Sequence, residues 1–204
     1  MEILQAMPKR TDAKEHLIAA AVRLFRAHGY DGVGVAQLLE ASGAPRGSLY
    51  FHFPGGKEEI AIAAIRRASA RVGERLAARR ARGEAPEVYI DGVLNAWAEE
   101  LSASDYANGC IVAIIALEMG ERAPALREET RAAFMKWETE FAAAARAWGM
   151  RETDAESFAS AMLGAIEGAI ALSRAKQSAA PFAHAATALK ALARDYLAGS
   201  GPSG

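Results

Sequence analysis

The chain has 204 residues, 51% hydrophobic and 24% charged, a length that fits one large domain or a small domain joined to a medium one. Its 49 alanines against seven phenylalanines and seven prolines favour helix over sheet, so we predict an all-helical protein. The formal net charge of −1 excludes a chain that attracts nucleic acid through its overall charge. Any DNA binding must therefore depend on a local arrangement of cationic residues.

Cysteine content and targeting signals narrow the class of protein. A single cysteine, Cys110, can form no internal disulfide and cannot supply a cysteine-rich zinc site. Residues 1–14 lack the long apolar run of a secretory signal, and the near-apolar stretch 158–172 is shorter than a membrane span of about 20 residues and contains Glu167. We expect a cytoplasmic protein without a membrane span, a metal site or a cofactor.

Three helices are predicted in the first quarter of the chain. The first ends at Gly29, and the second spans 35–42 and ends at Gly43, where a helix stop requires left-handed backbone. The third starts at Pro45, which suits the first helical position because its missing N–H has no helical partner there, and runs to about His52.

Prolines and glycines divide the remainder into longer helices. After the reversal at Pro54-Gly55-Gly56, a long helix begins at Lys57 and connects two parts of the chain. The final residues, 199–204, have nothing to bury and are predicted to be a disordered tail. The expected helices are 57–82, 86–102, 109–120, 124–148, 153–177 and 181–198.

The segment from Val35 to His52 has the layout of a helix-turn-helix, in which two short helices are braced by a longer first one and the second enters the major groove of DNA. Leu49 and Phe53 should face the core. An ordinary three-helix packing unit has the same spacing, so this pattern alone leaves both interpretations open. The candidate DNA-contacting residues on the third helix are Arg46, Gly47, Ser48, Tyr50 and His52.

The stretch from Gly43 to Glu59, which reads GAPRGSLYFHFPGGKEE, resembles the recognition helix and linker of the TetR-type bacterial transcriptional repressors. Segments 109–113, 116–118 and 166–169 are also similar to one branch of that family, typified by the lincomycin-resistance repressor. The resemblance implies a helix-turn-helix DNA-binding domain at 1–56 and a helical ligand-binding and dimerisation domain at 57–198.

The family's mechanism implies a homodimeric repressor and no catalytic residue. Two recognition helices would read half-sites roughly 34 Å apart on a palindromic, double-stranded operator, and a small hydrophobic or aromatic effector would respace them. Arg46 would reach a guanine edge or a phosphate, and Ser48 and Tyr50 a phosphate or a base. The full set of expected DNA contacts is Arg46, Gly47, Ser48, Tyr50, His52, Lys57, Lys9 and Arg10.

Two features depart from the family pattern. Many members carry Ser or Thr just before the second helix, where the hydroxyl caps the helix and touches phosphate, but this chain reads Val33-Gly34-Val35. Residues 1–60 also contain seven cationic and seven acidic residues, although the cationic ones cluster at helix starts. We expect moderate affinity for DNA with strong salt dependence.

The two C-terminal helices carry the expected dimer interface, for which packing inside one chain is the alternative. Residues 158, 162, 166 and 170 repeat every four positions, with two glycines beside them that permit close approach. The expected interface residues are Phe158, Gly164, Ile166, Glu167, Ile170, Leu189 and Leu192, and the expected effector-binding residues of the middle helices are Trp97, Tyr106, Cys110, Phe134, Trp137, Phe141 and Met162.

Glu167 lies in an apolar stretch and needs a partner, because an unpaired buried carboxylate is costly. Arg71, Arg174 or a second subunit would satisfy it, and a ligand contact is the alternative. Glu118, which follows an apolar run, has the same two interpretations.

Two other classes of protein compete with a repressor. An enzyme is disfavoured: Phe51 and Glu58 flank Gly55-Gly56-Lys57 where a phosphate loop requires Gly and Ser or Thr, and the sequence contains neither HExxH nor Gly-x-Ser-x-Gly. A ligand-independent helical adaptor or architectural DNA-binding protein is the stronger alternative. Release of DNA by a ligand would distinguish a repressor from it.

Overall fold

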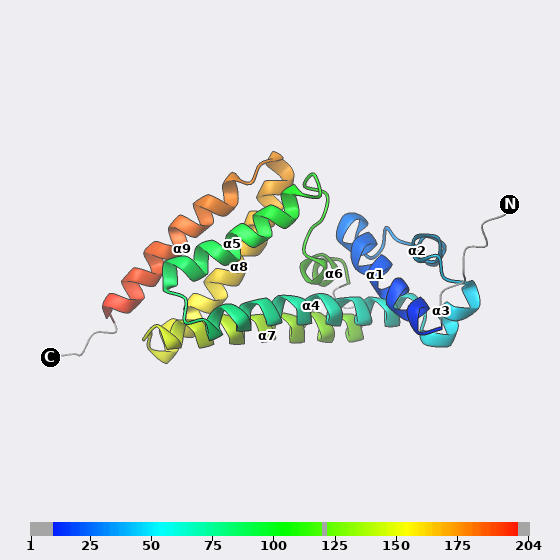
Figure 1. Ribbon diagram of the computed structural model, residues 1–204, viewed down its shortest axis with the longest axis horizontal. Helices are drawn as coiled ribbons and strands as arrows, with labels where there is room; N and C mark the ends of the chain where they lie inside the picture. Colours follow the sequence, from blue (N-terminus) through cyan, green and yellow to red (C-terminus); the bar gives the residue numbers. More distant parts are fainter. Residues whose placement is uncertain (1–9, 120–121, 200–204) are drawn as a thin grey trace.

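The computed structural model describes residues 10–119 and 122–199, with side chains described from residue 13 onward. Within those ranges the chain forms nine α-helices and no strand, which confirms the predicted all-helical class. The helices are α1 (Arg10–His28), α2 (Val35–Ser42), α3 (Arg46–His52), α4 (Lys57–Ala81), α5 (Pro86–Ser102), α6 (Ile111–Met119), α7 (Pro124–Ala147), α8 (Glu152–Lys176) and α9 (Ala180–Gly199) (Figure 1).

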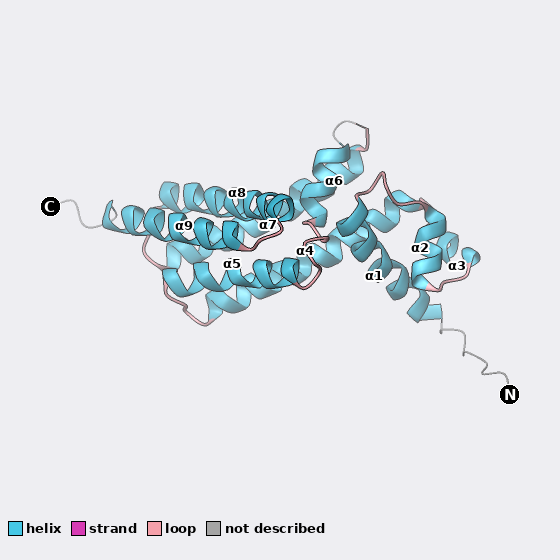
Figure 2. Cartoon of the chain, turned by 90° about the horizontal axis from the view of Figure 1, so that it is seen from above, coloured by secondary structure: helices cyan, strands magenta, loops and turns pink. Residues whose placement is uncertain are grey.

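The long helix α4 connects the two parts of the molecule. It starts beside α1–α3 at one end and extends to the far end, where α5, α8 and α9 lie (Figure 1). Helix α7 packs along α4, α8 packs on α7, and α9 packs on both α8 and α5. Figure 2 shows α6 between the group α1–α3 and the C-terminal helices, and α6 contacts α1, α4 and α7.

The helix ends lie within two residues of the predicted ones, and the differences have local causes. Gly43 ends α2 with φ 65°, as predicted, but Pro45 is the residue before α3 and not its first residue. The helix predicted from 109 begins at Ile111, because the amide of Gly109 donates to the carbonyl of Arg26 at 2.9 Å and holds this segment against α1. Gly199 belongs to α9 and not to the predicted tail, whose residues 200–204 lie outside the described ranges.

One apolar core extends through both parts of the chain. In the N-terminal part, the spacing of apolar residues turns one face of each short helix inward, and the side chains of Leu17, Leu38 and Leu49 are completely buried there. Phe53 is buried as well, as predicted. Helix α3 is therefore anchored to the core on one side, and its opposite face lies at the surface.

Among the described residues, α8 is long and apolar enough to cross a membrane, judged by length and composition. In the structure it packs between α7 and α9. Its stripe of Phe158, Met162 and Ile166 is buried in the protein's own core. A helix in the core of a soluble protein passes the same test of length and composition.

Candidate nucleic-acid interface and cavity

Helix α3 presents a polar and aromatic face at the surface. Arg46 and Tyr50 lie one turn apart on the same side of the helix, and Tyr50 is 48% exposed. No carboxylate in the described part of the chain forms an ion pair with Arg46, so its guanidinium faces solvent. A Cβ added at Gly47 would meet nothing within 4 Å, which leaves the backbone there open to close approach.

The other predicted DNA contacts are less exposed or are not described. Ser48 and His52 are half-buried, and the ring of His52 packs edge-on against Phe51 with 4.9 Å between centroids. Lys9 and the side chain of Arg10 lie outside the described residues. Sequence reasoning missed Phe51, which is 63% exposed beside Tyr50 and adds apolar surface to this face.

Lys57, at the start of α4, packs on an aromatic ring. Its Nζ lies 4.0 Å from the centroid of Tyr30, a cation–π contact. Burial lowers the pKa of Lys57, and the charges of Asp31 and Glu118 partly oppose that shift. Lys57 is thus held at the junction of the two parts of the chain, close to the surface that α3 presents.

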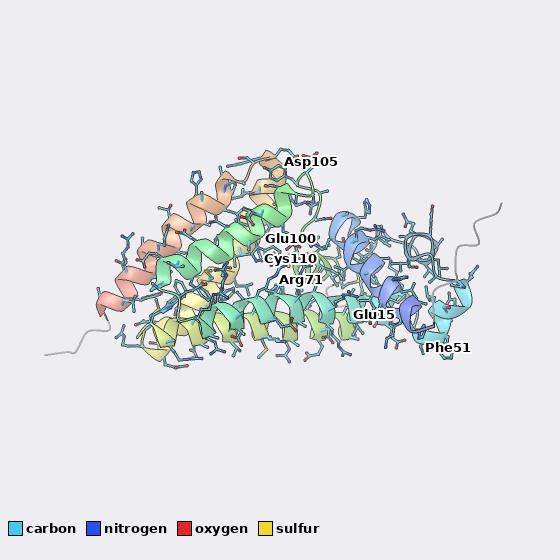
Figure 3. The ribbon with its side chains drawn as sticks, viewed as in Figure 1. Glu15, Phe51, Arg71, Glu100, Asp105 and Cys110 are labelled. Carbon is cyan, nitrogen blue, oxygen red and sulfur yellow. The ribbon has the colours of Figure 1, made fainter. Side chains whose placement is uncertain are left out.

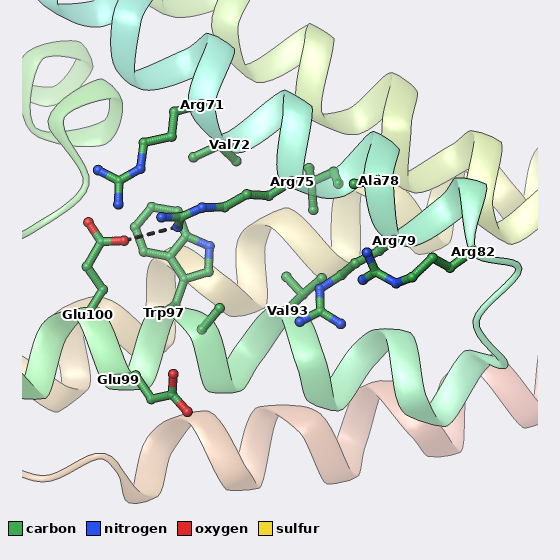
Figure 4. Close-up of a pocket in the computed structure, with 12 residues that line it drawn as sticks. Arg71, Val72, Arg75, Ala78, Arg79, Arg82, Val93, Trp97, Glu99 and Glu100 are labelled. Atoms are coloured by element: carbon green, nitrogen blue, oxygen red, sulfur yellow. Dashed lines mark hydrogen bonds and ion pairs between the residues drawn. The ribbon is translucent and has the colours of Figure 1, made fainter.

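A cavity of about 610 Å³ opens between α4 and α5 (Figure 4). A smaller cavity of about 70 Å³ continues from it toward α1 and α6. The two share five lining residues, and the smaller one adds side chains from the N-terminal part of the chain, including Arg26. The shared residues are Arg71, Val72, Arg75, Trp97 and Glu100.

Three of the seven predicted effector-binding residues line this space. Trp97 borders both cavities, and Cys110 and Trp137 border the smaller one. The indole N–H of Trp137 donates to the carbonyl of Ser69 at 3.1 Å, which fixes the ring. These three side chains come from α5, the segment before α6, and α7, so the fold gathers residues far apart in sequence.

The other four predicted residues lie elsewhere. Phe141 and Met162 are buried in the core, and Phe134 packs edge-on against Trp137 with 5.8 Å between ring centroids. Tyr106 lies in the loop after α5 in left-handed backbone with φ 58°. None of the four borders the two cavities.

The arginines of the cavity wall were missed by sequence reasoning. Arg71, Arg75, Arg79 and Arg82 all line the larger cavity from α4. Their spacing of four, four and three residues places them on one helix face, a signal that is present in the sequence. The same spacing also describes a solvated helix surface, and only the position of α5 distinguishes the two.

Glu100 links the cavity to the N-terminal helices. It accepts a hydrogen bond and an ion pair from Arg26 on α1, and Arg75 approaches its other oxygen at 3.3 Å. Burial favours a higher pKa for Glu100, but the hydrogen bond and charge of Arg26, together with Arg71 and Arg75, outweigh it and lower the pKa. Figure 3 shows Glu100 and Arg71 beside Cys110 between α1 and the C-terminal helices.

Glu118, near the end of α6, is a structural clamp. Its Oε2 accepts the backbone amide of Tyr30 at 2.6 Å and that of Asp31 at 3.2 Å. Arg122 adds an ion pair with Asp31 at 2.7 Å. The loop between α1 and α2 is therefore held by α6, which favours the structural interpretation of Glu118 over a ligand contact.

Glu167 has a different partner from the ones expected. The Cys110 thiol, and neither Arg71 nor Arg174, forms its hydrogen bond. Burial raises the pKa of Glu167 to about 7, although that hydrogen bond opposes the shift. Its Oε1 is buried and has no hydrogen-bond partner within the described chain. Burial likewise raises the pKa of the Cys110 thiol, and the charge of Glu167 adds to the effect.

Most of the predicted dimer-interface residues are buried within one chain. Phe158, Ile166, Ile170 and Leu189 are at most 5% exposed, so their apolar stripe forms intramolecular core, which was the alternative interpretation. The spacing showed that one face of α8 is buried, but not against what. The other three predicted residues are accessible: Gly164 is exposed, and Glu167 and Leu192 are half-buried.

The exposed surfaces of α8 and α9 include a strip of small side chains. On α8 the exposed positions repeat at roughly helical spacing, which gives one strip along the helix. A Cβ added at Gly164 or Gly168 would meet nothing within 4 Å in this chain. The exposed small residues are Ser157, Ser160, Gly164, Gly168, Ala171 and Ala175 on α8, and Ala183, Thr187, Ala188 and Ala191 on α9.

In the part of the chain that the structure describes, no three His, Cys, Asp or Glu side chains come together as a metal site would require.

Two family models match this chain. Residues 17–64 match the model of bacterial regulatory proteins of the tetR family, and residues 86–188 match the C-terminal domain model of LmrA/YxaF-like transcriptional regulators. The first match covers the helix-turn-helix and the start of α4. The second covers α5 to α8 and part of α9.

Whole-chain relatives agree with the domain matches. The chain is 32% identical over 173 residues to the HTH-type transcriptional regulator LmrA of Bacillus subtilis, covering 85% of this chain and 92% of LmrA. It is 30% identical over 188 residues to the uncharacterised HTH-type regulator YxaF of the same organism, covering 92% and 98%. These relatives are transcriptional regulators and not enzymes.

Solved structures show the same architecture. A TetR transcriptional regulator from Chloroflexus aurantiacus is similar with a TM-score of 0.73 and 30% identity, covering 90% of this chain and 94% of that one. The regulatory protein TetR from Rhodobacter sphaeroides is similar with a TM-score of 0.77 and 24% identity, covering 90% and 98%.

Proposed function

Since this chain belongs to the TetR family of bacterial transcriptional regulators, in its LmrA/YxaF-like branch, we propose that it is a ligand-responsive, dimeric repressor of a palindromic operator. The face of α3 carries this proposal, because Arg46 and Tyr50 are exposed together on a helix whose other side is anchored by Leu49. A small aromatic effector would bind the cavity between α4 and α5 and release the DNA. The protein would act in the cytoplasm, where the DNA is.

The two parts of the chain have different proposed roles. Residues 1–56 bind DNA, with Arg46 and Tyr50 reaching base edges or phosphates in the major groove. His52 and Lys57 contact the backbone, and Lys57 does so from its position on Tyr30. The helical part from 57 to 198 holds the effector and the partner subunit.

The proposed dimer interface is the small-residue strip of α8 and α9. Small side chains let two helix pairs approach closely, as a symmetric four-helix interface requires. Gly164 supports this assignment because it is exposed in the single chain, with space around it for another backbone.

The effector acts on DNA binding through contacts between the cavity and α1. Arg26 on α1 pairs with Glu100 of the cavity wall, and its Nε donates to the carbonyl of Gly109 at 2.9 Å. A ligand that moves α5 relative to α4 therefore displaces α1. The recognition helices of the two protomers are then respaced relative to the operator.

Selection of bound sequences from a random double-stranded DNA pool tests the proposal. The expected product is a site with two-fold symmetry and half-sites about one helical turn apart or slightly more. A selected site without two-fold symmetry would contradict the dimeric architecture. Titration of hydrophobic compounds against the complex with that site then distinguishes a ligand-responsive repressor from an architectural DNA-binding protein, which would retain its DNA.

A further inference from the structure

The larger cavity has one strongly cationic wall. Four arginines of α4 face α5 across it, and Glu99 and Glu100 are its only acidic lining residues in the described chain. In Figure 4, Glu100 points toward Arg71 and Arg75, whereas Glu99 extends from the opposite side of α5. A small molecule in this cavity therefore meets more positive than negative charge on the α4 side.

Part of this positive charge is paired with an acidic residue of the protein. Arg79 and Arg82 both pair with Glu84, at 3.0 Å and 2.6 Å. Arg79 also donates to the carbonyl of Gly92 at 2.8 Å and fills the space beside that glycine. These two arginines are therefore held by the chain itself at one end of the cavity.

At the other end of the cavity, the guanidinium of Arg71 has no direct ion-pair partner among the described residues. Glu100 is shared between Arg75, at 3.3 Å, and Arg26 on α1. Arg71 lies near the same carboxylate, but among the described residues no carboxylate forms an ion pair with it. Its side chain is exposed and lines both cavities. One carboxylate thus serves three arginines, and Arg71 is the one without a direct partner.

The surface next to Arg71 is aromatic and apolar. The indole ring of Trp97 lies beside Arg75 and the Glu100 carboxylate (Figure 4). Val72 and Val93 also line the space. A planar ring fits against Trp97 and these aliphatic groups, and an anionic substituent on that ring comes within reach of Arg71.

We propose that the effector of this cavity is an aromatic anion, a planar ring system with a carboxylate or sulfonate group. The ring packs on Trp97, and the anionic group pairs with Arg71, assisted by Arg75. This assignment rests on the proposed function and refines it: a purely hydrophobic ligand would leave the exposed guanidinium of Arg71 without an ionic partner, whereas an anionic group forms a charge-assisted pair with it in addition to the ring contact with Trp97.

Two fluorescent probes that differ in one group test the assignment. 1-Anilinonaphthalene-8-sulfonate carries a sulfonate, and N-phenyl-1-naphthylamine is the same ring system without it. The full-length dimer is expected to bind the sulfonate probe at least about tenfold more tightly than the neutral one. The Arg71→Gln variant should lose that preference through weaker binding of the sulfonate probe, with binding of the neutral probe changed less than about twofold.

Two control variants locate the effect. Arg80→Gln removes the same charge from α4 at a residue that pairs with Glu140, at 3.1 Å, and does not line the cavity. It should leave both dissociation constants unchanged. Trp97→Leu should weaken both probes, because each packs its rings on the indole. An equal response of the two probes to Arg71→Gln, or no response, overturns the assignment, as does failure of wild-type protein to bind the sulfonate probe.

Operator binding separates this inference from the proposed function. If the neutral probe binds as tightly as the sulfonate probe and releases operator DNA, the preference for anions is wrong and the ligand-responsive repressor stands. If wild-type protein selects no symmetric DNA site, the proposed function is wrong, whatever the probes do.

Discussion

Arg26 of α1 and Glu100 of α5 form a partly buried ion pair that joins the DNA-binding helices to the wall of the cavity. Residue 109 strengthens this junction, because its amide and carbonyl both bond to Arg26, each at 2.9 Å. Since Arg26 and its neighbouring arginines lower the pKa of Glu100 despite its burial, the carboxylate is ionised at neutral pH. At neutral pH, this ion pair therefore connects the wall of the cavity to α1.

Glu100→Gln should weaken this junction. We expect a loss of about 1–3 kcal/mol of unfolding free energy at pH 7, because Arg26 keeps its charge in a partly buried position without an ionised partner. Urea denaturation of variant and wild type measures the difference. The lowered pKa of Glu100 determines how stability depends on pH. The contribution of Glu100 to the unfolding free energy is present above its ordinary pKa of 4.5 and disappears as pH falls through the lower pKa of the folded state.

The matched control for this variant is Glu128→Gln. Glu128 also pairs with an arginine, Arg131, but both side chains are more than half exposed. Removing this ion pair should change the unfolding free energy much less than Glu100→Gln does, because solvent screens exposed charges. A cost for Glu100→Gln no larger than the control's would show that the junction does not stabilise the fold.

Arg46→Ala and Tyr50→Ala should each weaken binding to the DNA upstream of the protein's own gene. For Arg46 we expect about tenfold or more, because either a base contact or a phosphate contact is lost. Gel-shift titration at two salt concentrations tells these apart: loss of a phosphate contact reduces the salt slope by about one unit, whereas loss of a base contact relaxes the sequence preference.

The exposed Arg131, far from α3 in sequence, provides the control for these variants. Arg131→Ala removes one positive charge without touching the proposed interface and should leave the DNA affinity unchanged. Unchanged binding by both Arg46→Ala and Tyr50→Ala would contradict the assignment of this face.

Gly34→Ser should restore the helix cap that many family members carry. Gly34 precedes α2 in extended backbone with φ −94°, and an added Cβ would lie 3.7 Å from Gln37 Oε1, an ordinary contact. The serine hydroxyl caps α2 for a few tenths of a kcal/mol and reaches phosphate, so operator binding should tighten about tenfold. Gly34→Ala adds the same carbon without the hydroxyl, and affinity equal to that of Gly34→Ser would exclude the phosphate contact.

The sequence predicted what depends on short-range spacing. Gly43 and Pro54 end helices because their backbone preferences are local, and Leu49 and Phe53 face inward because helical periodicity turns them together. The contact between Lys57 and Tyr30 joins residues 27 positions apart, which periodicity cannot reveal.

The cavity wall and the partner of the buried face of α8 depend on long-range packing, which the sequence pattern does not show. A row of arginines on α4 looks like a solvated helix face until α5 is packed opposite it, and only then does Arg71 line a cavity. The stripe containing Phe158 was correctly recognised as a buried face, but spacing could not tell a partner subunit from the chain's own helices. Two helices of one bundle and two helices of a dimer have the same apolar periodicity.

Gly168→Leu should separate the subunits without damaging the fold. Nothing lies within 4 Å of a Cβ at this position in the single chain, and leucine has a higher helix propensity than glycine. The larger side chain therefore disturbs only a partner that packs there. Light scattering at micromolar concentration should give a mass near twice 21.6 kDa for wild type and near 21.6 kDa for the variant. Ala132→Leu, on the exposed side of α7, is the control, and a dimeric mass for Gly168→Leu would place the interface elsewhere.

Glu167→Gln should change how stability depends on pH. Burial raises the pKa of Glu167 from 4.5 to about 7, so the folded state holds a proton that the unfolded state releases between these values. Wild-type unfolding free energy therefore falls as pH rises through this window, by on the order of 1–3 kcal/mol, and the loss is complete above pH 7. The glutamine variant keeps the shape of the side chain and cannot ionise. Its unfolding free energy, measured by urea denaturation, should therefore exceed that of wild type by an amount that grows from pH 5 to pH 8.

Glu156→Gln, at an exposed position of the same helix, is the control and should leave the pH dependence of the unfolding free energy as in wild type. A constant difference in unfolding free energy between Glu167→Gln and wild type across this range would show that Glu167 does not titrate in it.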